Sequence, residues 1–360
     1  MRVLVSTGAF RHLTSAQTGA ALARAWAELG AQCAVVPIAE ANSGFGQAWA
    51  DLVGARSEGL ISVDGLAVEL HHEPLTGSLC LSVHVPAADD VDPLSSAPVG
   101  RAVAQALADF PAPANAEAPR ELLLEVSGAA WHDGGAGFLH ALGARAEQDL
   151  DGGVDALAGV ADVDLAPVRE RLAGAALTLV TSQDEAERHL VGLRGITSVR
   201  GHGRGDDPAR MLAIDQALMD LAAGFGAAAL ATTPGSGALG GLGFAVLLLA
   251  GAVVTGPQVC ASRAGLQQSM ERADLVVTGY DELEFGTKGG DLLPLVTELA
   301  QQSMKPVVAF ARRNWISARE LRTMGIEQAY GLAPATDGEH VLDEPAIMLA
   351  AAPSARTWSW

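Results

Sequence analysis

The chain has 360 residues, 49% of them hydrophobic, which is enough for two domains with large cores. Acidic residues number 42 and basic residues 23, so the formal net charge is −19 at pH 7. This charge argues against a general affinity for nucleic acid or for an anionic membrane surface. An anionic substrate would need a local cationic pocket that works against the overall field.

The three cysteines, Cys33, Cys80 and Cys260, lie far apart and form no CxxC pair. They give no disulfide framework, which favours a reducing compartment. The N-terminus lacks the charged-then-apolar pattern of a signal peptide. No apolar run reaches the roughly 18 residues that a membrane span needs. We therefore expect a cytoplasmic protein without a membrane partner, and the sequence leaves the oligomeric state open.

The first 60 residues alternate strand and helix patterns. Apolar runs predict buried strands at 3–5 and 33–36, and helical periodicity predicts helices at 15–29 and 47–53. This alternation favours an α/β layer with parallel strands.

The pattern then changes at Asp64-Gly65, a strong signal for a type I′ hairpin turn between two apolar runs. A third alternating strand at 79–85 completes an antiparallel meander, which does not belong to a doubly wound sheet. Further along we predict helices at 99–110 and 206–223, and strands at 122–126 and 177–180.

The stretch 234–251 is a glycine-dense loop that runs into an apolar helix at 244–250. Such a helix start directs free N–H groups at an anion, so a phosphate or carboxylate is one natural occupant. The alternative is that the glycines only permit close packing, and the sequence does not decide between the two. The loop also matches GxGxxG, but no strand precedes it and Cys260 stands where a dinucleotide fold has an acid.

Beyond this loop, we predict a helix at 262–271, parallel-type strands at 275–278 and 306–310, and a helix at 292–302 between those strands. We therefore predict a discontinuous α/β domain made of residues 1–64 and 272–360. Residues 65–271 form an inserted α/β domain.

Five loops in order resemble those of the type I bacterial glycerate kinase family. The segment TGAFRHLTSA at 7–16 is similar to PDSFKGSLSA, and PIAEANSGF at 37–45 to PMADGGEGT. DGGAG is intact at 133–137, and PGSGALGGLG at 234–243 is close to PGAGAAGGLG. The segment 273–287 resembles the family block aDLVITGEGRxDxQT.

The resemblance implies a two-domain glycerate kinase-like fold, with a parallel-sheet three-layer domain and an inserted mixed α/β domain. The implied reaction is phosphorylation of D-glycerate to a phosphoglycerate. ATP and Mg²⁺ are implied by the resemblance only, and no residue is assigned to the metal. The expected partner is a small anionic metabolite such as glycerate.

The resemblance to the family motifs identifies the candidate site residues. The catalytic candidates are Asp133, Glu40 and Glu284. The candidates for binding substrate or phosphate are Arg11, His132, Gly134, Gly135, Arg204, Gly235, Gly237, Gly240, Gly241 and Thr287. Other roles stay open: Asp133 could cap the helix that follows it, Glu40 and Arg11 could be surface residues, and a lone loop histidine such as His132 is often inert. Trp131 is more consistent with a loop anchor than with a stacking platform.

The departures from the family motifs fall on polar residues, whereas the scaffold glycines are kept. Gly8, Arg11, Ser43, Tyr280, Glu282 and Asp291 stand where the motifs have Asp, Lys, Glu, Glu, Arg and Lys. Two functions therefore stay open, a glycerate kinase-like enzyme with weakened or altered activity, and a non-catalytic relative that binds a small anion or a protein partner. We expect turnover of D-glycerate to be weak or absent.

Overall fold

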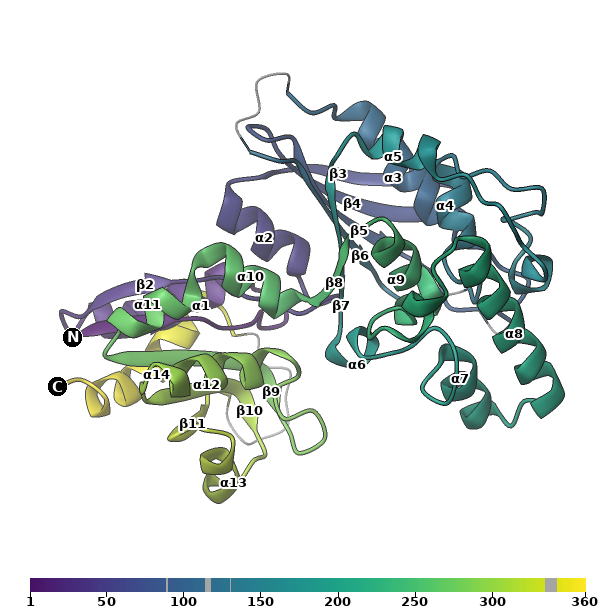
Figure 1. The fold of residues 1–360 in the computed structure, drawn as a ribbon. Coiled ribbons are helices and arrows are strands. Elements are labelled where there is room, and N and C mark those ends of the chain that lie inside the picture. Colours follow the sequence, from purple (N-terminus) through teal and green to yellow (C-terminus); the bar gives the residue numbers. More distant parts are fainter. Residues whose placement is uncertain (89, 114–117, 130, 334–341) are drawn as a thin grey trace. The chain divides into compact units, whose positions relative to one another are not determined.

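The computed structural model describes residues 1–88, 90–113, 118–129, 131–333 and 342–360. It divides into a first unit, Met1–Gly54 with Gly256–Trp360, and a second unit, Ala55–Thr255 (Figure 1). These boundaries differ from the predicted ones at 64 and 271. The strand β3 (Arg56–Val63) pairs with β4 (Leu66–Glu73), so the whole hairpin lies in the second unit. A hairpin is one hydrogen-bonded element, and the chain cannot change units at its turn.

Within the described residues, the first unit contains a five-stranded parallel sheet in the order β11-β10-β9-β1-β2. Its strands are β1 (Arg2–Val5), β2 (Gln32–Val35), β9 (Leu275–Leu283), β10 (Val307–Asn314) and β11 (Gln328–Gly331). The pair β1 and β9 joins the two ends of the chain, with Val3 opposite Leu275. The parallel sheet built from both chain ends is therefore present.

The helices of the first unit follow the predictions in part. They are α1 (Ser15–Ala27), α2 (Phe45–Val53), α10 (Gly256–Ala264), α11 (Leu266–Arg272), α12 (Leu292–Gln302), α13 (Ala318–Thr323) and α14 (Glu344–Thr357). The single helix predicted at 262–271 is wrong, because Gly265 has a φ of +57° and separates α10 from α11. The C-terminal helix α14 was not predicted, although Ile347, Ala351 and Ala355 recur at helical spacing and are buried.

Helices cover both faces of this sheet, which gives three layers. On one face, Trp26 of α1 meets Phe310 of β10 edge to face at 5.9 Å, and Ile347 of α14 joins the same core. Val3 and Val5 point to this side, so Leu4 between them points to the other face. The helices α11 and α12 contact β1 and β9, and Figure 1 shows them together on one side of the sheet.

The second unit contains, in the described chain, a six-stranded sheet in the order β3-β4-β5-β6-β7-β8. The remaining strands are β5 (Ser78–His84), β6 (Glu121–Val126), β7 (Ala176–Thr181) and β8 (Ala252–Thr255). Strands β3 to β5 are antiparallel, and β5 to β8 are parallel. The turn residues Asp64 and Gly65 have φ values of +50° and +80°, as the predicted type I′ turn requires.

Helices and two short 3₁₀ turns complete the second unit. They are α3 (Ala97–Asp109), α4 (Ala136–Leu142), the 3₁₀ turn Val154–Leu157, α5 (Ala166–Leu172), α6 (Gln183–Ala186), α7 (Ile196–Arg204), α8 (Pro208–Gly224), the 3₁₀ turn Ala228–Thr232 and α9 (Ala238–Leu248). The predicted core helix at 244–250 is confirmed in part, because Phe244 to Val246 of α9 are fully buried, whereas the helix ends at Leu248 and Ala250 is exposed. None of the helices described is both long and apolar enough to cross a membrane.

Candidate functional site

The carboxyl ends of β1 and β9 form the switch point of the first unit's sheet. From β1 the chain continues to β2 on one side, and from β9 it continues to β10 on the other. Ligands of open α/β sheets bind in the crevice at such a point. Gly8 follows β1, and its N–H donates to the carbonyl of Gly279 at 3.0 Å. A Cβ at Gly8 would lie 3.2 Å from Cδ1 of Leu292, so an apolar side chain flanks the position where the family motif has an acid.

Glu40 lies beyond the end of β2 and binds three donors of its own unit. Its Oε2 accepts a hydrogen bond from the Tyr280 hydroxyl at 2.8 Å. Its Oε1 accepts from the backbone N–H groups of Asp291 and Leu292, at 2.6 and 3.0 Å. These amides begin α12, where a negative charge is favoured by the helix dipole. The side chain therefore ties the loop after β2 to β9 and to α12.

The environment of this pair changes both pKa values. Burial raises the pKa of Glu40, and the hydrogen bonds from Tyr280 and from the amides of Leu292 and Asp291 lower it in part. Burial and the neighbouring Glu40 carboxylate raise the pKa of the Tyr280 phenol, which stays protonated as a donor. Glu40 is half-buried, so its carboxyl still exchanges protons with solvent.

Two further acids at this sheet edge are paired with an arginine. The guanidinium of Arg312 on β10 donates to Asp281 at 3.2 and 3.3 Å, and to Glu282. Arg312 is only 5% exposed. A glutamate at 282, where the family motif has an arginine, is thus matched by an arginine from the adjacent strand.

Three predicted site residues of the first unit are exposed. Arg11 lies in the turn between β1 and α1, with a φ of +43°. Glu284 and Thr287 lie in the turn between β9 and α12, where the N–H of Lys288 donates to the carbonyl of Glu284. Their exposure leaves these side chains accessible to a ligand.

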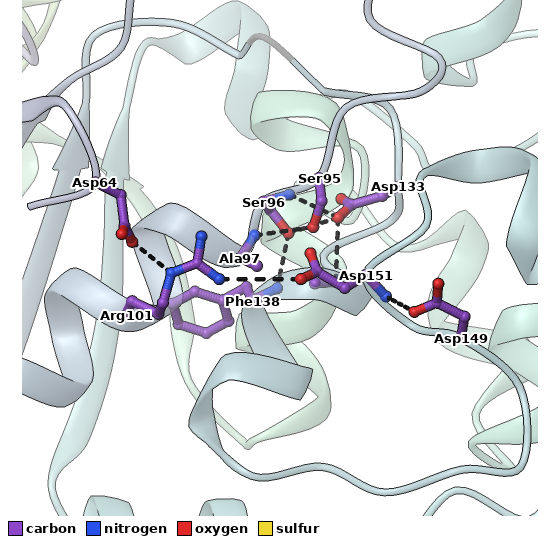
Figure 2. Close-up of polar contacts among 10 residues, drawn as sticks. Asp64, Ser95, Ser96, Ala97, Arg101, Asp133, Phe138, Asp149 and Asp151 are labelled. Atoms are coloured by element: carbon purple, nitrogen blue, oxygen red, sulfur yellow. Dashed lines mark hydrogen bonds and ion pairs between the residues drawn. The ribbon is translucent and has the colours of Figure 1, made fainter.

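Asp133 in the second unit has no exposed surface. Figure 2 shows its polar contacts with neighbouring residues. Its Oδ2 accepts hydrogen bonds from the N–H and hydroxyl of Ser96, both at 2.8 Å, and from the N–H of Gly137 at 3.1 Å. Its Oδ1 accepts from the N–H of Gly135 at 2.9 Å. The hydroxyl of Ser96 in turn accepts from the N–H of Phe138 at 2.8 Å. This carboxylate caps α4 and fixes it to the start of α3, which is the alternative role considered for Asp133.

The predicted phosphate-binding glycines of the second unit are buried against the chain itself. The places where their Cβ atoms would lie are occupied by neighbouring protein atoms, those of Trp131 beside Gly240, Gly134 beside Gly241, and His189 beside Gly237. Gly134 and Gly135 are flanked by side chains of α8 and α9, and Gly235 by Val253. The indole of Trp131 donates to the carbonyl of Leu239 at 2.9 Å, as expected of a loop anchor. Close packing explains why glycine is needed at these positions, and their binding of a phosphate stays a prediction.

The helix start that follows this loop also holds a carboxylate from the chain. Glu185 accepts a hydrogen bond from the N–H of Leu239 at 2.8 Å, and its other oxygen pairs with Arg188. Leu239, Gly240 and Gly241 have positive φ values, so the regular part of α9 begins at Leu242. A carboxylate of the same unit therefore lies at this loop, where the sequence made an anion one possible occupant.

His132 borders a small polar cavity of about 220 Å³ in the second unit. Its Nε2 lies 3.1 Å from the hydroxyl of Thr197, and its Nδ1 lies 3.9 Å from Asp92. Arg200 and Arg210 border the same cavity, and sequence reasoning missed both. Neither arginine lies in one of the five loops that resemble the family motifs, so the resemblance did not mark them.

Arg210 forms ion pairs with Asp92, at 2.9 Å, and with Asp155. Arg200 donates to the carbonyls of Trp131 and Ala129 and so supports the loop that carries His132. The side chain of Arg204, a predicted phosphate ligand, lies outside the described residues.

The residues present do not fit a magnesium site made by the protein in the first unit. Mg²⁺ in proteins is held by one or two carboxylates together with phosphate oxygens. At this sheet edge, Glu40 and the Asp281-Glu282 pair are already held by donors of the chain. In the described parts of the chain, no group of three or more His, Cys, Asp or Glu residues has an arrangement that could hold a metal ion.

Comparison with known proteins agrees with this architecture. Residues 3–355 match the sequence model of the Glycerate kinase family, and the chain belongs to this family. The glycerate kinase of Bacillus cereus is 29% identical over 201 residues, which cover 54% of this chain and 52% of that protein. The glycerate 2-kinase of Escherichia coli is 26% identical over 198 residues, which cover 53% and 51%. The matched region thus spans about half the length of these curated relatives.

The fold has a close counterpart among solved structures. The crystal structure of putative glycerate kinase 2 from Salmonella typhimurium LT2 superposes with a TM-score of 0.75, covering 99% of this chain and 98% of that chain. The sequence identity is 21%, so this similarity establishes the fold alone. The predicted glycerate kinase-like α/β fold is confirmed.

Proposed function

We propose that this protein transfers a phosphoryl group from ATP to a hydroxyl group of D-glycerate or a closely related hydroxy acid, at a rate well below that of an ordinary kinase. The observation that carries the proposal is the family match over residues 3–355. The reduced rate is supported by Gly8, Tyr280 and Asp291, which replace polar residues of the family motifs around the switch point.

In this proposal, the exposed side chains beyond β1 and β9 contact the substrate. Arg11 holds the substrate carboxylate, Glu284 accepts the proton of the attacking hydroxyl, and Thr287 donates a hydrogen bond to a phosphoryl oxygen. Positioning and charge stabilisation of this kind supply most of the catalysis in phosphoryl transfer. Mg²⁺ would enter with the phosphates of ATP, whose charge it neutralises.

Glu40 acts as a positioning residue, because both of its oxygens bind groups of the chain. It fixes Tyr280 and the start of α12. These two segments lie on either side of the loop that carries Glu284 and Thr287. Asp133 positions the loop after β6 in the same way, through its bonds to Ser96 and Gly137.

The test is a coupled assay of ADP release with D-glycerate and Mg·ATP on the full chain. Loss of one transition-state donor typically reduces the rate by about 100-fold or more. Several such losses place the expected kcat below about 1 per second, the lower end of the ordinary enzyme range. Glu284→Gln should reduce the remaining rate further, with Glu298→Gln on the exposed face of α12 as control. A kcat between about 1 and 1,000 per second would contradict the proposed weakening.

A second function, binding of a small anion without turnover, is favoured by one observation. Gly8, Tyr280 and Asp291 stand where the family motifs have Asp, Glu and Lys, so side chains of the motif chemistry are changed. Calorimetric titration with D-glycerate and with ATP separates the two functions. Binding of D-glycerate without ADP release above the uncatalysed background would favour the second.

A further inference from the structure

The first two strands of the second unit bring a serine, a histidine and a glutamate together, outside the loops that resemble the family motifs. Ser57 on β3 stands directly opposite His71 on β4. Residues directly opposite each other in an antiparallel pair share a face of the sheet. Residues two apart on one strand also share a face, which places Glu69 on the side of His71. All three residues belong to the second unit.

The three side chains form a continuous polar chain. The Ser57 hydroxyl lies 3.0 Å from Nδ1 of His71, and Nε2 of the same ring lies 3.4 Å from Oε1 of Glu69. A neutral imidazole with its proton on Nε2 directs this N–H toward the carboxylate and presents Nδ1 to the hydroxyl as an acceptor. The order of hydroxyl, imidazole and carboxylate is that of a serine hydrolase, which is recognised by geometry and not by sequence position.

The exposure of these residues suits the same chemistry. His71 is fully buried, whereas Ser57 is exposed and the side chain of Glu69 is 46% exposed. The surroundings therefore hold the imidazole in place, while the hydroxyl can meet a molecule that arrives from solvent. Imidazole is the side chain that enzymes use most often as a general base.

A β-bulge follows the serine on β3. The register shifts between Ser57 and Leu60, so that Glu58 and Gly59 stand opposite the single residue Leu70. Bulges interrupt the ladder of backbone hydrogen bonds, change the direction of a side chain and are frequent next to active sites. The N–H groups of the bulge immediately follow the serine in the chain, and an oxyanion formed at Ser57 needs donors of this kind.

We propose that Ser57 is the nucleophile of an esterase site, with His71 as the general base and Glu69 as the residue that positions the imidazole. This activity is separate from the proposed phosphoryl transfer and uses none of its residues. Esters of small uncharged acyl groups are the class of substrate, because the carboxylates of Glu58 and Glu69 next to the serine disfavour an anionic one.

The reaction needs no group beyond the ester and water. Nδ1 of His71 takes the proton of the Ser57 hydroxyl while Oγ forms a bond to the carbonyl carbon of the ester. The carbon–oxygen bond to the alcohol then breaks, and the alcohol leaves with the proton held by His71. Water attacks the acyl group on Ser57 with the same histidine as base, which releases the carboxylic acid and restores the serine.

The first test is labelling of the full chain with a fluorophosphonate, from which an activated serine displaces fluoride, followed by mass spectrometry of the digested protein. The unmodified protein should carry the phosphonyl group on Ser57, and Ser57→Ala should abolish the labelling. Ser262→Ala is the matched control, because Ser262 is an exposed serine on α10, and should leave the labelling unchanged. No labelling of the unmodified protein, or labelling at other residues only, would overturn the proposal.

The second test is the hydrolysis of p-nitrophenyl acetate by the same variants. Ser57→Ala and His71→Gln should each lower kcat by about 100-fold or more, the contribution typical of general-base catalysis. Ser57 is exposed, so the result for Ser57→Ala does not depend on whether the buried His71→Gln variant folds. Glu69→Gln should lower kcat by up to about 5-fold with KM unchanged, since a partly exposed ion pair contributes little. Equal kcat values for Ser57→Ala and the unmodified protein would overturn the proposal, and a change confined to KM in Glu69→Gln would overturn the positioning role.

Discussion

Asp133 in the second unit and Glu40 in the first unit are two carboxylates on motif loops with different surroundings. Asp133 is fully buried and receives hydrogen bonds from Ser96, Gly135 and Gly137. Glu40 is half-buried, and one of its three donors is the side chain of Tyr280. Both accept hydrogen bonds from backbone N–H groups near the start of a helix, where these groups lack partners within the helix.

The difference shows how the two loops preserve their shape. The loop of Asp133 is fixed mainly by backbone N–H groups and by close glycine packing, with one side-chain donor, the hydroxyl of Ser96. The region of Glu40 depends on one side-chain pair that links segments 240 residues apart. Substitutions around Asp133 should therefore change the stability of the protein. Substitutions around Glu40 should change both its stability and its activity.

The largest effect is expected for Gly241→Ala. Its φ is +93°, and a Cβ there would overlap the backbone of Gly134. The left-handed conformation and the forced shift together should reduce the free energy of unfolding by about 3–5 kcal/mol in urea denaturation. Gly226→Ala, with a φ of +66° and open space, is the control and should lose only about 1–2 kcal/mol. Unchanged stability with lost ATP binding would show that the glycine serves a ligand.

Asp133→Asn should reduce the free energy of unfolding by about 3 kcal/mol. If the amide nitrogen replaces Oδ2, it faces the donors of Ser96 and Gly137, and if it replaces Oδ1, it faces that of Gly135; buried donors are left without an acceptor in either case. The control is Asp149→Asn, an exposed residue of Figure 2 that accepts one hydrogen bond, from Asp151. The control should change stability by less than about 0.5 kcal/mol. A stable Asp133→Asn variant with abolished turnover would make Asp133 catalytic.

Glu40→Ala should cost about 2 kcal/mol of stability, because the amides of Asp291 and Leu292 and the hydroxyl of Tyr280 lose their acceptor. Glu40→Gln retains an oxygen for the amides and should cost less than about 1 kcal/mol. If Glu40 is a positioning residue, the glutamine variant keeps most of the residual kcat and the alanine variant does not. Complete loss of kcat in Glu40→Gln, with its stability intact, would contradict the positioning role.

The smallest expected effect is on the pH dependence of stability. Burial raises the pKa of folded Glu40 above its ordinary value of 4.5. Between pH 4.5 and the raised pKa of the folded state, folded Glu40 binds more protons than unfolded Glu40. Glu40 therefore makes the free energy of unfolding fall as the pH rises through this window. Denaturation of the unmodified protein and Glu40→Gln from about pH 4 to about pH 7 should show a weaker fall in the variant. A steeper fall in the variant would mean that the folded pKa is lowered.

The sequence by itself determined the positions of many elements and the family. The apolar periodicity at 292–302 coincides with α12, and Asp64-Gly65 forms the predicted turn. Such signals are local, because the periodicity of a helix or strand and the φ preference of a turn depend on residues next to each other in the chain. The predicted boundary at 64 still missed the strand pairing of β3, which depends on hydrogen bonds to a neighbouring strand.

Only the tertiary structure decided which polar groups meet. Glu40 and the amide of Asp291 are 251 residues apart, and Glu185 reaches the amide of Leu239 across 54 residues. The sequence alone does not distinguish a ligand from close packing at the Pro234 loop, because both require glycine. Only the tertiary structure shows that Trp131 and Gly134 pack against that loop. Burial and hydrogen-bond partners depend on contacts between distant segments, and those contacts exist only once the chain has folded.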